Sequence, residues 1–134
     1  MAGVAVLDAS ALIALFNSKD SHHAWAIKTM NDTLDLDLKM PALTYSEALV
    51  IPFEKNFQNE FLAGISGLNL ELINIESSEA LEIAKLRAET KLRIPDVVVL
   101  HAAIKLSATL VTADTKLAKT ALSQGLKVFT PAAD

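Results

Sequence analysis

The chain has 134 residues, the size of one domain, and it contains no cysteine. The lack of cysteine excludes disulfides, thiol catalysis and zinc–thiolate sites. Hydrophobic residues make up 51% of the chain, yet no apolar run reaches the roughly 20 residues that a membrane-spanning helix needs. The net charge is −4, which weighs against nucleic-acid binding through overall charge alone.

The remaining whole-chain features predict a single intracellular domain. Residues 1–3 lack the basic and apolar segments of a signal peptide, so we expect the protein in the cytoplasm and not in a membrane. No linker-like segment or repeat divides the chain, which predicts one domain over residues 1–134. The mean hydropathy of +0.34 indicates either a large core or an exposed apolar patch that binds a partner.

Short apolar runs alternate with segments that carry helix start and stop signals. In chain order, the predicted elements are a strand over residues 4–7, helices over 11–16 and 21–32, a strand over 38–40, helices over 44–55 and 56–65, a strand over 70–75, helices over 77–91 and 95–106, a strand over 109–112, a helix over 115–124 and a strand over 127–129. This alternation predicts an α/β fold, a three-layer α/β/α sandwich with a central, mainly parallel sheet.

Four acidic residues stand where predicted helices begin, and each has a structural interpretation of its own. Asp8 and Asp114 are placed to cap the helices that follow them. Glu47 completes a capping-box pattern that starts at Thr44, and Asp96 lies in a first turn, where the helix dipole favours negative charge. Taken singly, each acid is best explained as part of a helix terminus.

Taken together, the four acids favour a metal site. Asp8 and Asp114 each follow a buried strand, and Glu47 and Asp96 begin helices, so all four should converge beyond the carboxyl ends of parallel strands. Carboxylates gathered there would repel one another, and Mg²⁺ or Mn²⁺ would relieve that repulsion. Such ions activate water and stabilise the leaving oxygen in phosphodiester hydrolysis. Because these acids account for the whole net charge, the rest of the chain is neutral.

The same residues carry a resemblance to a known family. The segments that carry it are VLDASALIAL (6–15), TYSE (44–47), IPD (94–96) and LVTAD (110–114). In this order and spacing they resemble the PIN domain and, more narrowly, the VapC-type toxins of bacterial toxin–antitoxin pairs. The resemblance implies a ribonuclease that cleaves RNA internally with Mg²⁺ or Mn²⁺, and it implies that Asp8, Glu47, Asp96 and Asp114 bind the metal and act in catalysis.

Further expectations follow from the resemblance. Ser10 and Thr112 match frequent hydroxyl positions near the site, although a helix cap and a strand end explain them equally well. Many relatives carry another acid or an aromatic residue soon after the fourth carboxylate, whereas residues 115–117 here are Thr-Lys-Leu. This departure favours one firmly held ion. The resemblance also implies an RNA substrate, a homodimer and inhibition by a cognate antitoxin.

Two other functions remain open. The chain is alternatively a catalytically weak PIN-like module that binds RNA or protein, although the presence of all four acids argues against it. A phosphoacceptor signalling domain has a similar size, but it needs paired acids after the first strand and a lysine after the last; this chain has Asp8 alone and then Thr130-Pro131. The basic residues Arg87, Lys91 and Arg93 either meet phosphates or form a solvated face, and the second is favoured.

Overall fold

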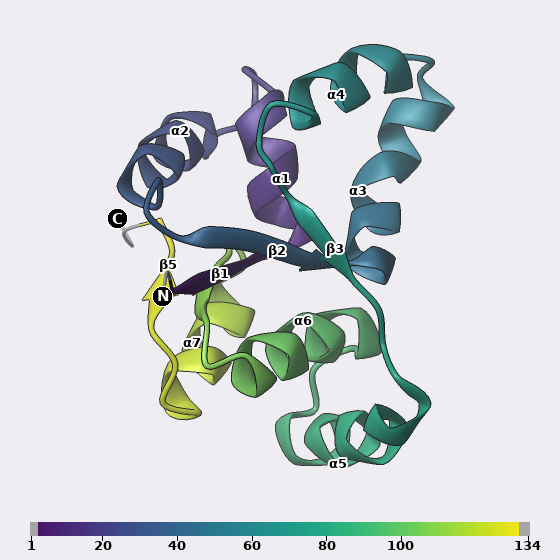
Figure 1. The fold of residues 1–134 in the computed structure, drawn as a ribbon, viewed down its shortest axis with the longest axis vertical. Helices are drawn as coiled ribbons and strands as arrows, with labels where there is room; N and C mark the ends of the chain where they lie inside the picture. Colours follow the sequence, from purple (N-terminus) through teal and green to yellow (C-terminus); the bar gives the residue numbers. More distant parts are fainter. Residues whose placement is uncertain (1–2, 132–134) are drawn as a thin grey trace.

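A parallel sheet of five strands lies between two layers of helices in the computed structural model, which describes residues 3–131 (Figure 1). The strands are β1 (Val4–Leu7), β2 (Asp37–Pro41), β3 (Glu71–Ile73), β4 (Thr109–Val111) and β5 (Val128–Phe129). The helices are α1 (Ala9–Phe16), α2 (His23–Asp32), α3 (Ala42–Glu54), α4 (Gln58–Ile65), α5 (Ala80–Thr90), α6 (Ile94–Lys105) and α7 (Thr115–Ser123), with a 3₁₀ turn, η1 (Ser77–Glu79), before α5. The predicted three-layer α/β/α class is confirmed.

The strand order places one switch in the middle of the sheet. The order is β3-β2-β1-β4-β5, and every neighbouring pair is parallel. The chain therefore moves outward from β1 through β2 to β3, and then returns to add β4 and β5 on the other side. In open parallel sheets, ligands bind beyond the carboxyl ends of the strands at such a switch. Leu7 pairs with Val111 across it, so the residues that follow β1 and β4 emerge side by side.

The reversal in strand order also divides the helices between the two faces. Helices α1 to α4 cover one face of the sheet, and α5, α6 and α7 cover the other (Figure 1). This follows because right-handed crossovers that run in opposite directions along a sheet lie on opposite faces. The fold thereby brings the beginnings of α1 and α3 from one layer, and of α6 and α7 from the other, to the same edge of the sheet (Figure 1).

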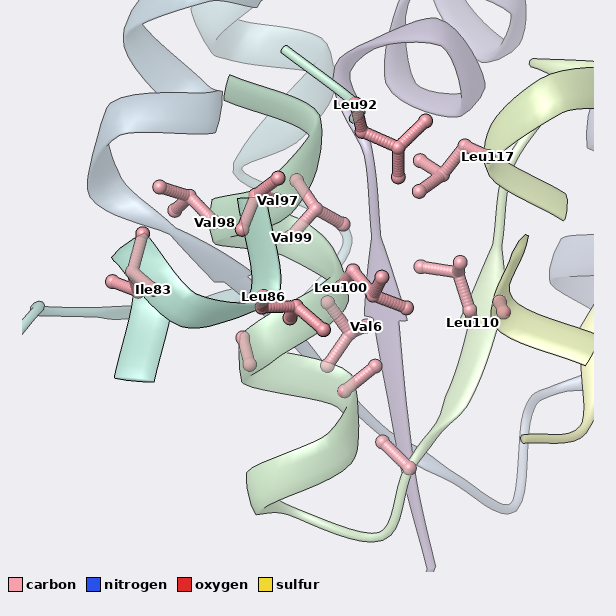
Figure 2. Close-up of a cluster of buried hydrophobic side chains, with 14 residues drawn as sticks. Val6, Ile83, Leu86, Leu92, Val97, Val98, Val99, Leu100, Leu110 and Leu117 are labelled. Atoms are coloured by element: carbon pink, nitrogen blue, oxygen red, sulfur yellow. The ribbon is translucent and has the colours of Figure 1, made fainter. Parts of the chain in front are cut away.

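Each sheet face has its own hydrophobic core, because alternate residues of a strand point to opposite faces. Val6 in β1 and Leu110 in β4 pack with Leu100 of α6 in the lower layer (Figure 2). Leu7 and Val111, the next residues along the same strands, pack into the other layer. Helix α6 is buried at seven consecutive positions, from Val97 to Ala103, so it is the central helix of its layer.

Among the predicted boundaries that differ from the structure, the start of α3 matters most, because its correction removes a predicted cap. Helix α3 begins at Ala42 with Pro41 as its N-cap, so Thr44 is already inside the helix and does not form a capping box with Glu47. Pro41 ends β2 in an extended conformation, and its fixed φ of −60° lets the helix begin at the next residue. Thr44 is buried, and its hydroxyl has no hydrogen-bond partner. Glu47 is thus free of any capping role.

Two further observations concern the rest of the fold. His101 is buried in α6, and its Nε2 lies 2.7 Å from Glu82 Oε2, which links α6 to α5. Within residues 3–131, the structure contains no helix with the length and apolar character that crossing a membrane requires.

Replacing the core leucine Leu100 by alanine should lower the free energy of unfolding by about 2–5 kcal/mol, because it leaves a cavity in the layer below the sheet. Leu100 is fully buried, whereas Leu81 in α5 is 83% exposed and provides a matched leucine-to-alanine control. Leu81→Ala should change the free energy by less than about 0.5 kcal/mol. Urea unfolding measures both variants, and similar losses for the two would contradict this assignment of the core.

Candidate active site

Asp8 stands at the switch point and is almost completely buried, with 5% of its surface exposed. It is the N-cap of α1: Oδ1 accepts a hydrogen bond from the Ala11 amide at 3.0 Å, which confirms the predicted cap. The same oxygen accepts a hydrogen bond from the Ser10 hydroxyl at 2.6 Å, and Oδ2 accepts one from the Thr112 hydroxyl. The buried carboxylate therefore has donors on both oxygens.

The two hydroxyl groups also fix the loop that follows β4. Ser10 Oγ accepts a hydrogen bond from the Ala113 amide at 3.0 Å, and Thr112 Oγ1 accepts one from the Asp114 amide at 2.9 Å. Each hydroxyl group thus donates a hydrogen bond to Asp8 and accepts one from a backbone amide of the β4–α7 connection. Ser10 and Thr112 join the ends of β1 and β4 through the Asp8 side chain, which places both predicted accessory residues against the first carboxylate.

Asp114 begins α7 on the neighbouring strand connection. Its Oδ1 accepts a hydrogen bond from the Leu117 amide at 3.1 Å, so the predicted cap is confirmed. The side chain is half-buried. Because its own amide binds Thr112, Asp114 is held to Asp8 through one intervening hydroxyl group.

Asp96 and Glu47 come from helices in opposite layers. Asp96 lies in the first turn of α6, and Glu47 lies two turns into α3; these helices contact each other beyond the sheet edge. Arg93, the N-cap residue of α6, places its Nε 3.6 Å from Asp96 Oδ2. The Asp96 side chain is 22% exposed and that of Arg93 is 81% exposed, so the ion pair is open to solvent on the arginine side.

Electrostatic effects connect all four acids. Burial raises the pKa of Asp8, and the charge of Asp114 raises it further, while the hydrogen bonds from Ser10 and Thr112 oppose the rise. The pKa of Asp96 is raised by burial and then by Asp114. Burial and the charge of Asp96 raise the pKa of Glu47. Each carboxylate therefore lies within electrostatic range of at least one other.

Two cations act on these acids: Arg93 was predicted only as part of a solvated basic cluster, and Lys116 was not predicted to lie near the site. Arg93 opposes the upward pKa shift of both Asp96 and Glu47, and Lys116 in α7 opposes that of Asp96. The spacing of Arg93 and Asp96 along the chain is the signal that pointed to the first of these contacts, because residues three apart are neighbours on a helix. Lys116 has no such signal, since its position relative to Asp96 depends on how α6 and α7 pack.

The chemistry of these donors suits a hard divalent cation, which prefers carboxylate oxygen. An ionised carboxylate has about four acceptor positions, and three on Asp8 are used by Ser10, Ala11 and Thr112, so Oδ2 retains one. Within residues 3–131, no three Asp, Glu, His or Cys side chains are gathered closely enough to form a ready-made metal site. The acids thus provide suitable ligands without a preformed ligand shell, and Asp96 is engaged by Arg93.

Comparisons with known proteins agree with this architecture. The family model described as PIN domain matches residues 5–123. No curated protein gives a significant sequence match. Among solved structures, a toxin–antitoxin complex from Klebsiella pneumoniae is 25% identical, with a TM-score of 0.71, and the match covers 84% of this chain and 88% of that one.

Two more distant structures share the fold. FitAcB from Neisseria gonorrhoeae is 20% identical, with a TM-score of 0.71 and coverage of 94% of this chain and 96% of that one. VapC20 from Mycobacterium tuberculosis, described as a sarcin-ricin loop cleaving toxin, is 10% identical, with a TM-score of 0.73 and coverage of 87% and 94%. The similarity therefore extends over nearly the whole length of each protein.

The raised pKa of Asp8 predicts how stability depends on pH. A carboxyl group whose pKa rises on folding stabilises the fold fully below its unfolded pKa, near 3.8, and loses that contribution as pH rises through the folded pKa. In metal-free solution, Asp8→Asn should therefore gain free energy of unfolding relative to the parent as the pH rises from acid to neutral. Asparagine can still cap α1.

Urea unfolding in EDTA at a series of pH values measures this difference. The exposed residue Asp35 provides the control, and Asp35→Asn should follow the pH profile of the parent. A constant difference between Asp8→Asn and the parent across the whole range would show that the burial of Asp8 does not perturb its titration.

Proposed function

The chain belongs to the PIN domain family, and we propose that it is a divalent-metal-dependent endoribonuclease, the toxin of a type II toxin–antitoxin pair. The observation that carries this proposal is the buried Asp8 carboxylate at the switch point, with Asp114 in electrostatic range of Asp8 and Asp96 in electrostatic range of Asp114. Such a site concentrates negative charge where a parallel sheet binds its ligands. VapC20, which shares the fold, is described as cleaving an RNA loop, and RNA cleavage by this chain is our proposal.

The proposed roles follow from the contacts of each side chain. We assign Asp8, Glu47, Asp96 and Asp114 as the ligands of one Mg²⁺ or Mn²⁺ ion and as the catalytic acids. Such an ion supplies activation of water and stabilisation of the negative charge that develops on the leaving oxygen. Ser10 and Thr112 orient Asp8 and keep its carboxylate from rotating. Arg93 balances part of the charge of Asp96 before an ion is bound.

The Arg93–Asp96 ion pair supports one competing function. If Asp96 remained engaged by Arg93, the site would hold an ion poorly, and the chain would act as a PIN-like module that binds RNA or protein without cleaving RNA. The two functions differ in the effect of metal, because a ligand that binds only the folded state raises the melting temperature.

Asp8→Asn and Asp96→Asn should each slow RNA cleavage by about 100-fold or more, because each removes a carboxylate that would hold the ion. The assay uses end-labelled single-stranded and stem–loop RNAs in Mn²⁺, and EDTA should abolish cleavage by the parent. Glu54→Gln provides a control on α3, since Glu54 lies on the exposed face of the helix that carries Glu47.

Metal binding gives a second readout that does not depend on activity. Mn²⁺ should raise the melting temperature of the parent and of Glu54→Gln, and it should have a much smaller effect on Asp8→Asn and Asp96→Asn. If Mn²⁺ leaves the melting temperature of the parent unchanged, and the parent binds RNA without cleaving it, the chain is the binding module and not a nuclease.

For the partner, we infer an antitoxin protein that covers an apolar groove between α1, α3 and α4. This groove has a volume of about 630 Å³, and its walls include Phe16, Ile51 and Phe57. Ile51 is half-exposed, as are its neighbours Val50 and Phe53, and exposed apolar patches of this kind mark interaction sites. The Klebsiella structure is a toxin–antitoxin complex, which supports a partner of this type. The expected homodimer remains a prediction.

Ile51→Asp should prevent the partner from binding, because it places a charge in the wall of the groove. The chain is co-expressed with the protein encoded by the neighbouring reading frame, and the complex is measured by affinity purification and gel filtration. Leu81→Asp introduces the same charge on α5, in the opposite layer, and should leave the complex intact. Equal recovery of the partner with both variants would place the interface elsewhere.

A further inference from the structure

We propose that Arg93 and Lys116 form a cationic rim that binds backbone phosphates of RNA beside the carboxylate cluster. This inference rests on the proposed function, since it concerns how the same site holds its substrate. It assigns a substrate-binding role to two residues that the capping and metal-ligand interpretations leave unused.

The position of Arg93 suits a phosphate ligand. Its contact with Asp96 uses Nε, at 3.6 Å, so the two terminal nitrogens of the guanidinium group remain for another anion. The side chain is 81% exposed while its carboxylate partner is 22% exposed, so the guanidinium group stands on the solvent side of the cluster. Planar guanidinium groups bind phosphate through two parallel hydrogen bonds, and Arg is therefore common where proteins contact nucleic-acid backbones.

Lys116 provides a second charge from a different element. It is an exposed residue in the first turn of α7, two residues after Asp114, and its charge acts on Asp96. Arg93 is the N-cap residue of α6, whereas Lys116 lies on α7, so the two charges act on Asp96 from separate helices. Because both side chains are exposed, neither is needed to complete the hydrophobic core.

Charge balance explains why such a rim is needed. The four carboxylates carry the whole net charge of the protein, and one divalent ion removes only half of their charge. Without further cations, the site would still repel a phosphodiester backbone, which carries one negative charge per nucleotide. Arg93 and Lys116 together compensate the remaining half. The chain therefore needs no extended basic surface to bring RNA to an acidic site.

The test measures RNA binding by the parent as a function of salt, with Ca²⁺ in place of Mg²⁺ so that the intact carboxylates can hold a divalent ion, and a gel checks that the RNA stays uncleaved. A short fluorescein-labelled single-stranded RNA is titrated with protein in Ca²⁺, and the dissociation constant is read by anisotropy at several KCl concentrations. Each lost phosphate contact should reduce the log–log salt slope by about 0.7. Arg93→Ala and Lys116→Ala should each weaken binding up to about tenfold at low salt, equally for RNAs of different sequence.

Two control variants separate this role from others. Lys85→Ala removes an exposed charge from α5 and should leave both affinity and slope unchanged. Arg93→Lys keeps the charge, so it should keep the salt slope and recover part of the affinity. If Arg93 served only to hold Asp96, Arg93→Ala would alter the cleavage rate and leave the salt slope as in the parent, and the proposal would be overturned.

The remaining outcomes are also decisive. A salt slope that falls equally for Lys85→Ala would show that RNA is attracted by charge in general and not by the rim, and a parent protein that binds no RNA in Ca²⁺ would end the proposal. Cleavage by the parent reports on the proposed nuclease, whereas the salt slopes report on the rim. A protein that cleaves RNA while its slopes are unaffected by Arg93→Ala and Lys116→Ala retains the proposed function and loses this inference.

Discussion

At the carboxyl ends of β1 and β4, the fold depends on one buried carboxylate, Asp8, and on the hydroxyl groups that donate hydrogen bonds to it. A carboxylate removed from water without partners would cost several kcal/mol, so Asp8 can occupy the switch point only with donors on both oxygens. Ser10 and Thr112 provide them and, through the amides of Ala113 and Asp114, attach the β4–α7 connection to the first strand. The contact between Asp8 and Thr112 spans 104 positions of the sequence, so it forms only when β1 and β4 pair.

The acidic side chains at the carboxyl ends of the strands lower the stability of the fold, although the proposed function needs them. Burial, and after it the charge of a neighbouring acid, raises the pKa of Asp8, Asp96 and Glu47, which means that the ionised forms of these three are disfavoured in the folded protein. The two hydrophobic cores compensate for this repulsion elsewhere, through strands whose alternate residues are buried on both faces. A bound divalent ion would remove much of the repulsion, so metal binding and folding would be coupled in this protein.

Much of the fold follows from the sequence, because short apolar runs and helix termini are local signals. The strand at Val4–Leu7 and the end of α7 at Gly125, whose φ is +85°, are examples. The start of α3 was wrong because Thr44 matches a cap in sequence, whereas the preceding proline had already begun the helix. The acids were found through their place after strands and at helix starts. The effect of the Lys116 charge on Asp96 was not predicted, since packing between helices leaves no local signal.

The capping and metal-ligand interpretations of the acids are compatible. Asp8 and Asp114 each cap a helix through Oδ1, and in both cases the helix amide lies three residues further along the chain. A cap holds the side chain in one conformation, and in a parallel sheet the helix starts meet at the edge where ligands bind. Capping thereby fixes the orientation of a carboxylate through one oxygen, and the second oxygen of Asp8 accepts from Thr112 and still retains one acceptor position. A short parallel-sheet domain can thus orient its acids with the N-cap hydrogen bonds that a helix start requires. The proposed ion would then bind the acceptor positions that these hydrogen bonds leave free.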